Sequence, residues 1–184
     1  IFFFSVYAQE ENGDFRSRTS GNWNVATSWE EYQGTWGPTT NVPSSTSDVE
    51  ISSDHTLSVD AANAVGDNVT IKGSGVLNIL SGGTLTAGAS VKTQDFGSLN
   101  VLAGGSLTCT DLDIVNSTDP ATESTVAGTV TMNGQLVVTD KSILTITGTV
   151  NGFDNLILGG LITVSGTGAT LQQGASGIDW DLGG

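Results

Sequence analysis

The side chains that could carry out chemistry in this chain are few and scattered. Two carboxylate groupings are tight enough to act together, namely Glu30-Glu31 and the pair Asp111 and Asp113. Positions 111 and 113 would point to the same side of a strand, so their carboxylates could share a Ca²⁺ ion or flank a glycosidic bond. Ca²⁺ takes six or more oxygen ligands, however, and no compact loop here supplies them. We therefore predict ordinary strand patterning at these acids and no metal site.

The sequence lacks the combinations of residues that nucleophilic and acid–base catalysis usually require. Cys109 is the only cysteine, so the chain can form no internal disulfide, and a catalytic thiol would need a histidine partner. The single histidine, His55, is far away in the sequence. Polysaccharide lyases built on β-helices combine clustered acids with an Arg or Lys base, whereas the five basic residues of this chain are scattered. Serine-protease, phosphate-loop and nucleotide-binding motifs are absent as well, so we predict no catalytic residues, no enzymatic activity and no cofactor.

Four aromatic residues crowd into the short segment 23–36, and they allow two interpretations. An open end of a β-helix exposes backbone edges and an apolar core, so an aromatic segment placed there would cap it. Alternatively, flat aromatic faces with Asn and Glu nearby could bind a sugar. The candidate carbohydrate-binding residues are Trp23, Trp29, Tyr32 and Trp36.

A repeated phrase indicates which elements position these residues. "LNILSGGTLTAG" begins at Leu77 and "LNVLAGGSLTCT" begins at Leu99, 22 residues later. A looser pair, "AGTVTMNGQLVV" from Ala127 and "TGTVNGFDNLIL" from Thr147, is offset by 20 residues. Apolar and polar residues alternate on both sides of the glycines, which is the period of a half-buried strand.

A repeat of this length predicts one coil of a parallel β-helix. The fold class is therefore all-β, a right-handed parallel β-helix with coils of about 20–22 residues and an aromatic N-terminal cap. We expect inward Leu, Ile and Val to stack into ladders, while outward Thr, Ser and Asn face water. A β-sandwich of short hairpins is the alternative fold. The expected first strands are Val49–Ile51, Thr56–Val59, Asn68–Ile71 and Val76–Ile79.

The domain organisation follows from this pattern. Residues 9–47 form the cap segment and residues 48–184 form about six coils of β-helix. Flat ladders of outward threonines could bind an ice or crystal surface, although the threonine pairs look too irregular in the sequence.

The charge balance excludes several partners. The chain has 19 acidic and 5 basic residues, a formal net charge of −14 and a hydrophobic content of 37%. Such a negative field repels nucleic acid and anionic lipid headgroups. We expect no nucleic-acid partner and no membrane insertion.

The first eight residues allow two fates. "IFFFSVYA" resembles the end of a secretory signal that would be cut before Gln9, and it is too short to span a bilayer as a helix. If it stays on the chain, it could add as a strand to an edge of this protein or of a neighbouring subunit. The candidate self-assembly residues are Ile1, Phe2, Phe3, Phe4, Val6 and Tyr7.

The segment "SRTSGNWNVATSWEEYQGTWGPTTNVPSSTSDVEI", followed by "DHTLSVDAANAVGDNVTI", resembles a known group of proteins. It is similar to the N-terminal region of secreted, adhesin-like surface proteins of Bacteroidetes and, distantly, to the G8 domain of extracellular proteins. The resemblance covers roughly residues 16–110 and implies export by the type IX system. It depends mainly on Gly21, Asn22, Trp23, Trp29, Val42, Pro43 and Asp48.

We therefore predict a secreted, non-catalytic structural protein of the cell surface, acting as an adhesin or spacer or as a filament or matrix subunit. Its partners would be copies of itself, joined by strand addition or coil stacking, or a cell-surface polysaccharide. The alternative is a carbohydrate-binding module or a lyase-like β-helix that acts on an acidic polysaccharide.

Overall fold

The structure is a computed structural model that describes residues 10–117 and 119–174, and the backbone of residues 179–181. The strand expected over Ile1–Tyr7 lies outside the described residues. Short strands stack into three sheets, here called A, B and C, with one 3₁₀ turn, η1 (Ala26–Ser28).

Sheet A consists of β4 (Trp36–Pro38), β3 (Trp29–Tyr32), β1 (Phe15–Ser17), β5 (Val49–Ile51), β8 (Val69–Ile71), β11 (Ser90–Thr93), β14 (Asp111–Ile114), β17 (Gln135–Val138), β20 (Asn155–Leu158) and β23 (Asp179–Asp181). Sheet B consists of β2 (Gly21–Asn22), β6 (Thr56–Val59), β9 (Val76–Ile79), β12 (Ser98–Val101), β15 (Thr122–Val126), β18 (Ser142–Ile146) and β21 (Leu161–Val164). Sheet C consists of β7 (Ala64–Gly66), β10 (Thr84–Ala87), β13 (Ser106–Thr108), β16 (Thr129–Thr131), β19 (Thr149–Phe153) and β22 (Thr170–Gln173).

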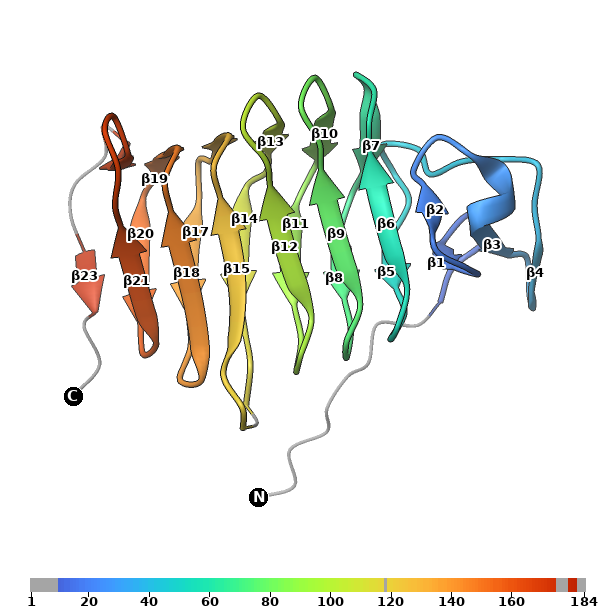
Figure 1. Ribbon diagram of the computed structural model, residues 1–184. Coiled ribbons are helices and arrows are strands. Elements are labelled where there is room, and N and C mark those ends of the chain that lie inside the picture. The colour runs from blue at the N-terminus through green and yellow to red at the C-terminus, as the bar shows by residue number, and fades with distance from the viewer. Residues whose placement is uncertain (1–9, 118, 175–178, 182–184) are drawn as a thin grey trace.

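Each full coil gives one strand to each sheet, and from β5 onward every pairing is parallel. In Figure 1 the strands of sheet B run upward on the near side, those of sheet A run downward behind, and the coils advance from right to left. This is right-handed winding, the usual hand for parallel crossovers. The predicted all-β parallel β-helix is confirmed, with about six coils spaced about 21 residues apart.

The repeated phrases are successive coils, as their alignment predicted. Leu77 pairs with Leu99 and Ile79 pairs with Val101, and all four side chains are fully buried. In the looser pair, Val130 and Leu136 pair with the residues 20 positions later. Because side chains alternate between the two faces of a strand, each inward residue stacks on the inward residue of the next coil. These ladders form one continuous core.

The Gly-Gly corners are required by two different constraints. Gly82 and Gly104, the first glycine of each pair, have φ of +80° and +81°, a backbone region that favours glycine. The second glycine lies against the preceding coil: a Cβ at Gly83 would collide with the Val59 carbonyl oxygen, and one at Gly105 would lie 2.6 Å from the Ile79 carbonyl oxygen. The close approach of neighbouring coils therefore leaves no room for a side chain at these corners.

The segment expected as a cap is continuous with the coils. β1 pairs in parallel with β5, and β2 pairs in parallel with β6, so strands on both sides of residue 48 belong to the same sheets. Beyond β1 the direction changes, because β3 is antiparallel to β1 and β4 is antiparallel to β3. The edge strand β4 ends in Pro38, which has no N–H to offer to a further strand.

Two indole rings close this end of the core. Trp23 and Trp29 are 1% and 0% exposed, and their rings meet edge to face at 5.1 Å. Trp29 Nε1 donates to the Trp23 carbonyl oxygen at 2.7 Å, and Phe15 packs against the same Trp29 ring. The Trp23 Nε1 group is buried and has no hydrogen-bond partner among the described residues. The predicted aromatic cap is thus built mainly from these two tryptophans.

Gly83→Ala should destabilise the protein strongly. Its Cβ meets backbone of the preceding coil, which cannot rotate away, so we expect a loss of roughly 3 kcal/mol in the free energy of unfolding. Gly37→Ala is the matched control, because that position has open space around its Cβ. Denaturant unfolding followed by circular dichroism measures both; equal stability of the two variants would contradict the tight corner.

The two capping tryptophans should differ in their response to loss of the indole N–H. Trp29→Phe and Trp23→Phe remove the same volume, but only the first breaks a buried hydrogen bond. We expect Trp29→Phe to cost about 1–2 kcal/mol more than Trp23→Phe. Chemical denaturation of both variants gives the difference, and a larger cost for Trp23→Phe would mean that its Nε1 does have a partner.

Candidate functional site

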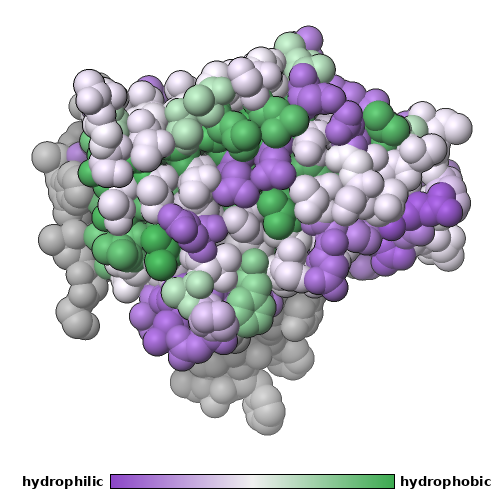
Figure 2. Space-filling model, in the orientation of Figure 1, coloured by the Kyte–Doolittle hydropathy of each residue, from purple (hydrophilic) through white to green (hydrophobic). Residues whose placement is uncertain are grey.

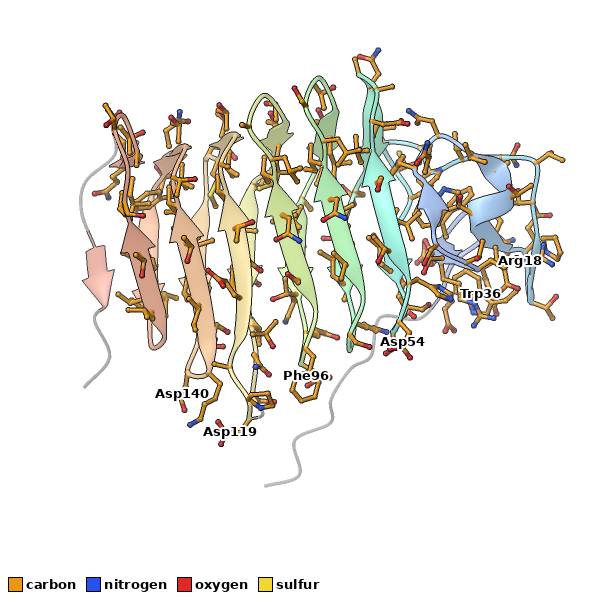
Figure 3. All side chains as sticks on the ribbon, viewed as in Figure 1. Arg18, Trp36, Asp54, Phe96, Asp119 and Asp140 are labelled. Atoms are coloured by element: carbon orange, nitrogen blue, oxygen red, sulfur yellow. The ribbon has the colours of Figure 1, made fainter. Side chains whose placement is uncertain are left out.

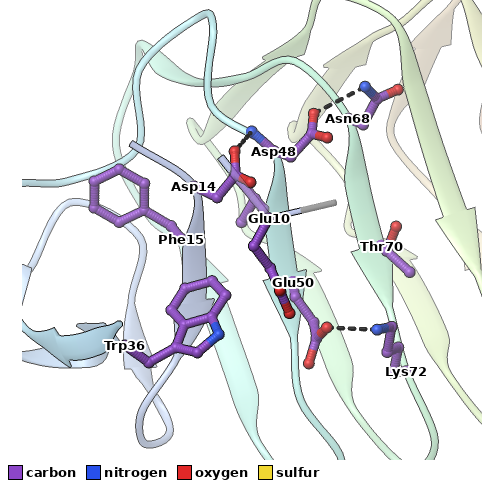
Figure 4. A pocket seen from close by; sticks show the side chains of 10 residues that line it. Glu10, Asp14, Phe15, Trp36, Asp48, Glu50, Asn68, Thr70 and Lys72 are labelled. Carbon is purple, nitrogen blue, oxygen red and sulfur yellow. Dashed lines mark hydrogen bonds and ion pairs between the residues drawn. The ribbon is translucent and has the colours of Figure 1, made fainter. Parts of the chain in front are cut away.

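A pocket of about 150 Å³ lies on the outer face of sheet A, beside the cap (Figure 4). Strands β1, β4, β5 and β8 and the chain just before β1 contribute to its walls. Its lining combines one indole ring with carboxylates, an amide and an ammonium group. The lining residues are Glu10, Asp14, Phe15, Trp36, Asp48, Val49, Glu50, Asn68, Thr70 and Lys72.

The antiparallel hairpin of the cap creates one wall of this pocket. Trp36 is in the edge strand β4, and in Figure 4 its indole faces the side chains that project from β5. The Arg16 guanidinium lies 4.6 Å from the Trp36 ring centroid, and Tyr32 meets the ring edge to face at 5.4 Å. Arg16 is in turn held by Glu30, with Nη2 and Oε2 2.7 Å apart. The indole is therefore held in place by contacts with a cation and a second ring.

The polar side of the pocket is built from outward positions of neighbouring coils. Glu50 of β5 forms an ion pair with Lys72 directly after β8, at 2.5 Å between Oε2 and Nζ. Asn68 Nδ2 donates to Asp48 Oδ1 at 2.9 Å. Asp14 Oδ1 accepts a bond from the Asp48 backbone N–H at 3.3 Å. An aromatic wall opposite paired carboxylate, amide and ammonium groups can hold a polar ring by stacking and hydrogen bonding.

The structure separates the four aromatic residues that the sequence groups together. Trp23 and Trp29 lie in the core, where no ring face is accessible to a sugar, so their proposed contact with a ligand is wrong on physical grounds. Tyr32 and Trp36 are half-buried at the surface, and their planes meet at 61°, so they do not form one flat platform. Trp36 alone lines the pocket. The sequence alone does not predict the polar lining, because Glu50 and Lys72 are brought together only by the pairing of β5 with β8.

The adjacent acids Glu30 and Glu31 do not act as a pair. Glu30 is bound to Arg16, whereas Glu31 accepts bonds from Thr39 Oγ1 at 2.6 Å and Asn41 Nδ2 at 2.9 Å. These two bonds, that from Thr39 first, hold the pKa of Glu31 below its usual value. The carboxylate of Glu31 thus orders the loop that follows β4.

Asp111 and Asp113 lie on one face of β14, as expected, and have separate surroundings. Asp111 Oδ1 accepts the Gln135 backbone N–H at 2.7 Å. Asp113 lies beside Lys92 of the preceding coil; burial raises its pKa, while Lys92 acts in the opposite direction. Among the described residues, no group of three or more His, Cys, Asp or Glu side chains could hold a metal ion.

Cys109 and His55 occupy different parts of the solenoid. Cys109 is 3% exposed, and burial, together with the charges of Asp111 and Asp113, raises the pKa of its thiol to about 12. His55 Nδ1 lies 2.9 Å from Ser17 Oγ, so the ring joins the first full coil to β1. A thiol with this pKa stays protonated and is a poor nucleophile.

Within the described part of the chain, no helix has the length and apolar character that a membrane crossing requires.

The comparisons with known proteins do not assign the chain to a family. No family model, curated protein or solved structure matches it. The similarity to secreted Bacteroidetes surface proteins and to G8 domains therefore stays a prediction based on the residues quoted above, and the structure supports the β-solenoid fold alone.

Proposed function

We propose that this chain is a secreted, non-catalytic structural module of a cell surface, acting as a spacer or adhesin. The observation that carries the proposal is the continuous stack of in-register coils around one apolar core. A strongly acidic surface, with a net charge of −14, suits a module that must stay soluble outside the cell. The resemblance to adhesin-like proteins points in the same direction.

A solenoid of this kind is suited to hold two points at a fixed distance. Neighbouring strands are about 4.8 Å apart, so six coils extend over about 30 Å along the stacking axis. Every coil is hydrogen-bonded to the next along three sheets, which resists bending and stretching of the stack. Adding coils lengthens such a module without changing its cross-section.

Assembly into filaments is the finer form of the same proposal. The last full coil has more exposed apolar side chains than the others: Leu161 and Val164 of β21 are 54% and 44% exposed. Figure 2 shows apolar side chains at this end of the visible face and in a band across its upper middle, whereas the cap end is mostly polar. A second copy that stacked on this coil would cover them. Strand addition by Ile1–Tyr7, the other route, concerns residues outside the described part.

Light scattering and electron microscopy over a wide range of protein concentration test the structural role. We expect rod-shaped particles that associate end to end as the concentration rises, and no release of reducing ends or unsaturated sugars from acidic polysaccharides. Leu161→Lys should weaken association, whereas Leu102→Lys, at an exposed corner of an inner coil, should not. Turnover of a polysaccharide would overturn the non-catalytic role. Particles that stay monomeric at every concentration would rule out assembly into filaments.

Carbohydrate binding is the second candidate, and the pocket beside Trp36 favours it. The ring is at the surface, in contact with Arg16 and Tyr32 and beside Glu50, and the polar groups of Asp48 and Asn68 line the same pocket farther from the ring (Figure 4). Carbohydrate binding at this pocket is compatible with the proposed adhesin role, since an adhesin must bind a ligand on another surface.

Trp36→Ala should reduce polysaccharide binding about tenfold, the effect of losing one stacking contact of about 1.4 kcal/mol. Phe96→Ala is the matched control, because Phe96 is an exposed aromatic residue at a corner of an inner coil, away from the cap, as labelled in Figure 3. Affinity electrophoresis in gels containing surface polysaccharides measures both variants. If the gel retarded both variants equally, the pocket beside Trp36 would not be part of the polysaccharide-binding site.

A further inference from the structure

The outer face of sheet C carries two rows of uncharged side chains, most of which bear a hydroxyl group. The outward positions of β10, β13 and β16 have the sequence Thr-x-Thr or Ser-x-Thr, with a buried Leu or Val between them. In-register pairing places like positions side by side. The first row contains Thr84, Ser106, Thr129, Thr149 and Thr170, and the second contains Val65, Thr86, Thr108, Thr131, Asn151 and Gln172.

The regularity of these rows is a property of the fold. In the sequence the threonine pairs look irregular, because successive coils differ in length. The register of sheet C removes that irregularity: Thr84, Ser106 and Thr129 occupy equivalent places although their spacings differ. The register of sheet C therefore aligns threonines whose spacing in the sequence is irregular.

The hydroxyl groups of this face are available to a ligand. Thr86, Thr108, Thr129 and Thr131 are exposed, and their side chains make no hydrogen bond within the part of the chain that the structure describes. The outer face of sheet B differs, because there Asn100 donates to Asn78 at 3.0 Å and accepts from Thr125 at 2.9 Å. Sheet B satisfies its own polar groups, whereas sheet C presents them outward.

Sheet C is also uncharged in a strongly acidic protein. Its six strands contain no Asp, Glu, Lys or Arg, although the chain has 19 acidic residues. Sheet A, by contrast, places Glu50, Lys92 and Asp113 among its strands. A shallow groove of about 340 Å³ follows the second row past Thr86, Thr108 and Thr131. The face therefore fits a neutral ligand with a regular, extended surface.

We propose that this face binds ice. Hydroxyl groups repeat about every 4.8 Å from coil to coil and about every 6.6 Å along each parallel strand, two residues apart. A two-dimensional lattice of this kind matches a crystalline partner with similar repeats, and ice offers planes on which water oxygens repeat at comparable distances. Each threonine supplies a methyl group beside a hydroxyl group, which orders water next to the surface and bonds to it.

The composition of the face favours ice over a sugar. Sugar sites combine aromatic faces with directional amide or carboxylate groups, as the pocket beside Trp36 does. The outward rows of sheet C contain no aromatic and no charged side chain. Ice binding is independent of the structural role proposed above, since it uses a different face.

Thermal hysteresis, the gap between the melting and freezing temperatures of a single ice crystal, tests this proposal. We expect the protein to shape ice crystals, to open such a gap and, when fluorescently labelled, to enter a growing ice hemisphere. Thr131→Lys and Thr108→Lys should each abolish most of the gap, because a lysine holds water in its own hydration shell and projects beyond the threonine rows. Thr163→Lys, at an exposed outward threonine of sheet B, should leave the gap unchanged.

Circular dichroism and thermal denaturation establish that the variants fold, which is expected because all three positions are exposed. No hysteresis and exclusion of the folded wild-type protein from ice would overturn the proposal. Adsorption to crystalline cellulose or chitin, lost in Thr131→Lys and unaccompanied by ice binding, would overturn it in favour of a polysaccharide surface.

Discussion

The structure depends on one constraint, the in-register pairing of each coil with the next. A strand of three or four residues cannot hold itself together, and the core of one coil is too thin to exclude water. Pairing between coils solves both problems. It gives the backbone N–H and C=O groups hydrogen-bond partners, and it stacks buried residues such as Leu77 on Leu99. Corner glycines follow from the same constraint, since the turn of one coil must lie against the backbone of its neighbour.

The three outer faces show how one scaffold carries different chemistry. Inward positions are interchangeable among Leu, Ile and Val, but outward positions are free to vary from sheet to sheet. Sheet A carries ion pairs such as Glu50 with Lys72, sheet B carries a ladder of amides and hydroxyls, and sheet C carries aligned rows of threonines. Each face repeats its pattern because the same position recurs in every coil. Function in such a protein is therefore a property of rows of residues.

Much of the fold could be predicted from the sequence, because alternation and repeat length act locally. The strands Val49–Ile51, Thr56–Val59 and Val76–Ile79 have the predicted bounds. The sites were less accessible. Nothing local distinguishes buried Trp29 from surface Trp36, since both lie in short strands of the cap without a repeat. The pocket lining and the threonine rows join residues of different coils, and their contacts depend on the coil lengths, which the sequence pattern leaves variable.

The cap has a consequence for the order in which the protein is made. Because β1, β2 and the two core tryptophans precede the coils, the residues of the sealed end have all been synthesised before the first full coil, which then pairs with β1 and β2. Each later coil then emerges from the ribosome next to a finished edge on which it can pair. Pairing in this order closes a loop of only about one coil at each step, which keeps the entropic cost of each step small.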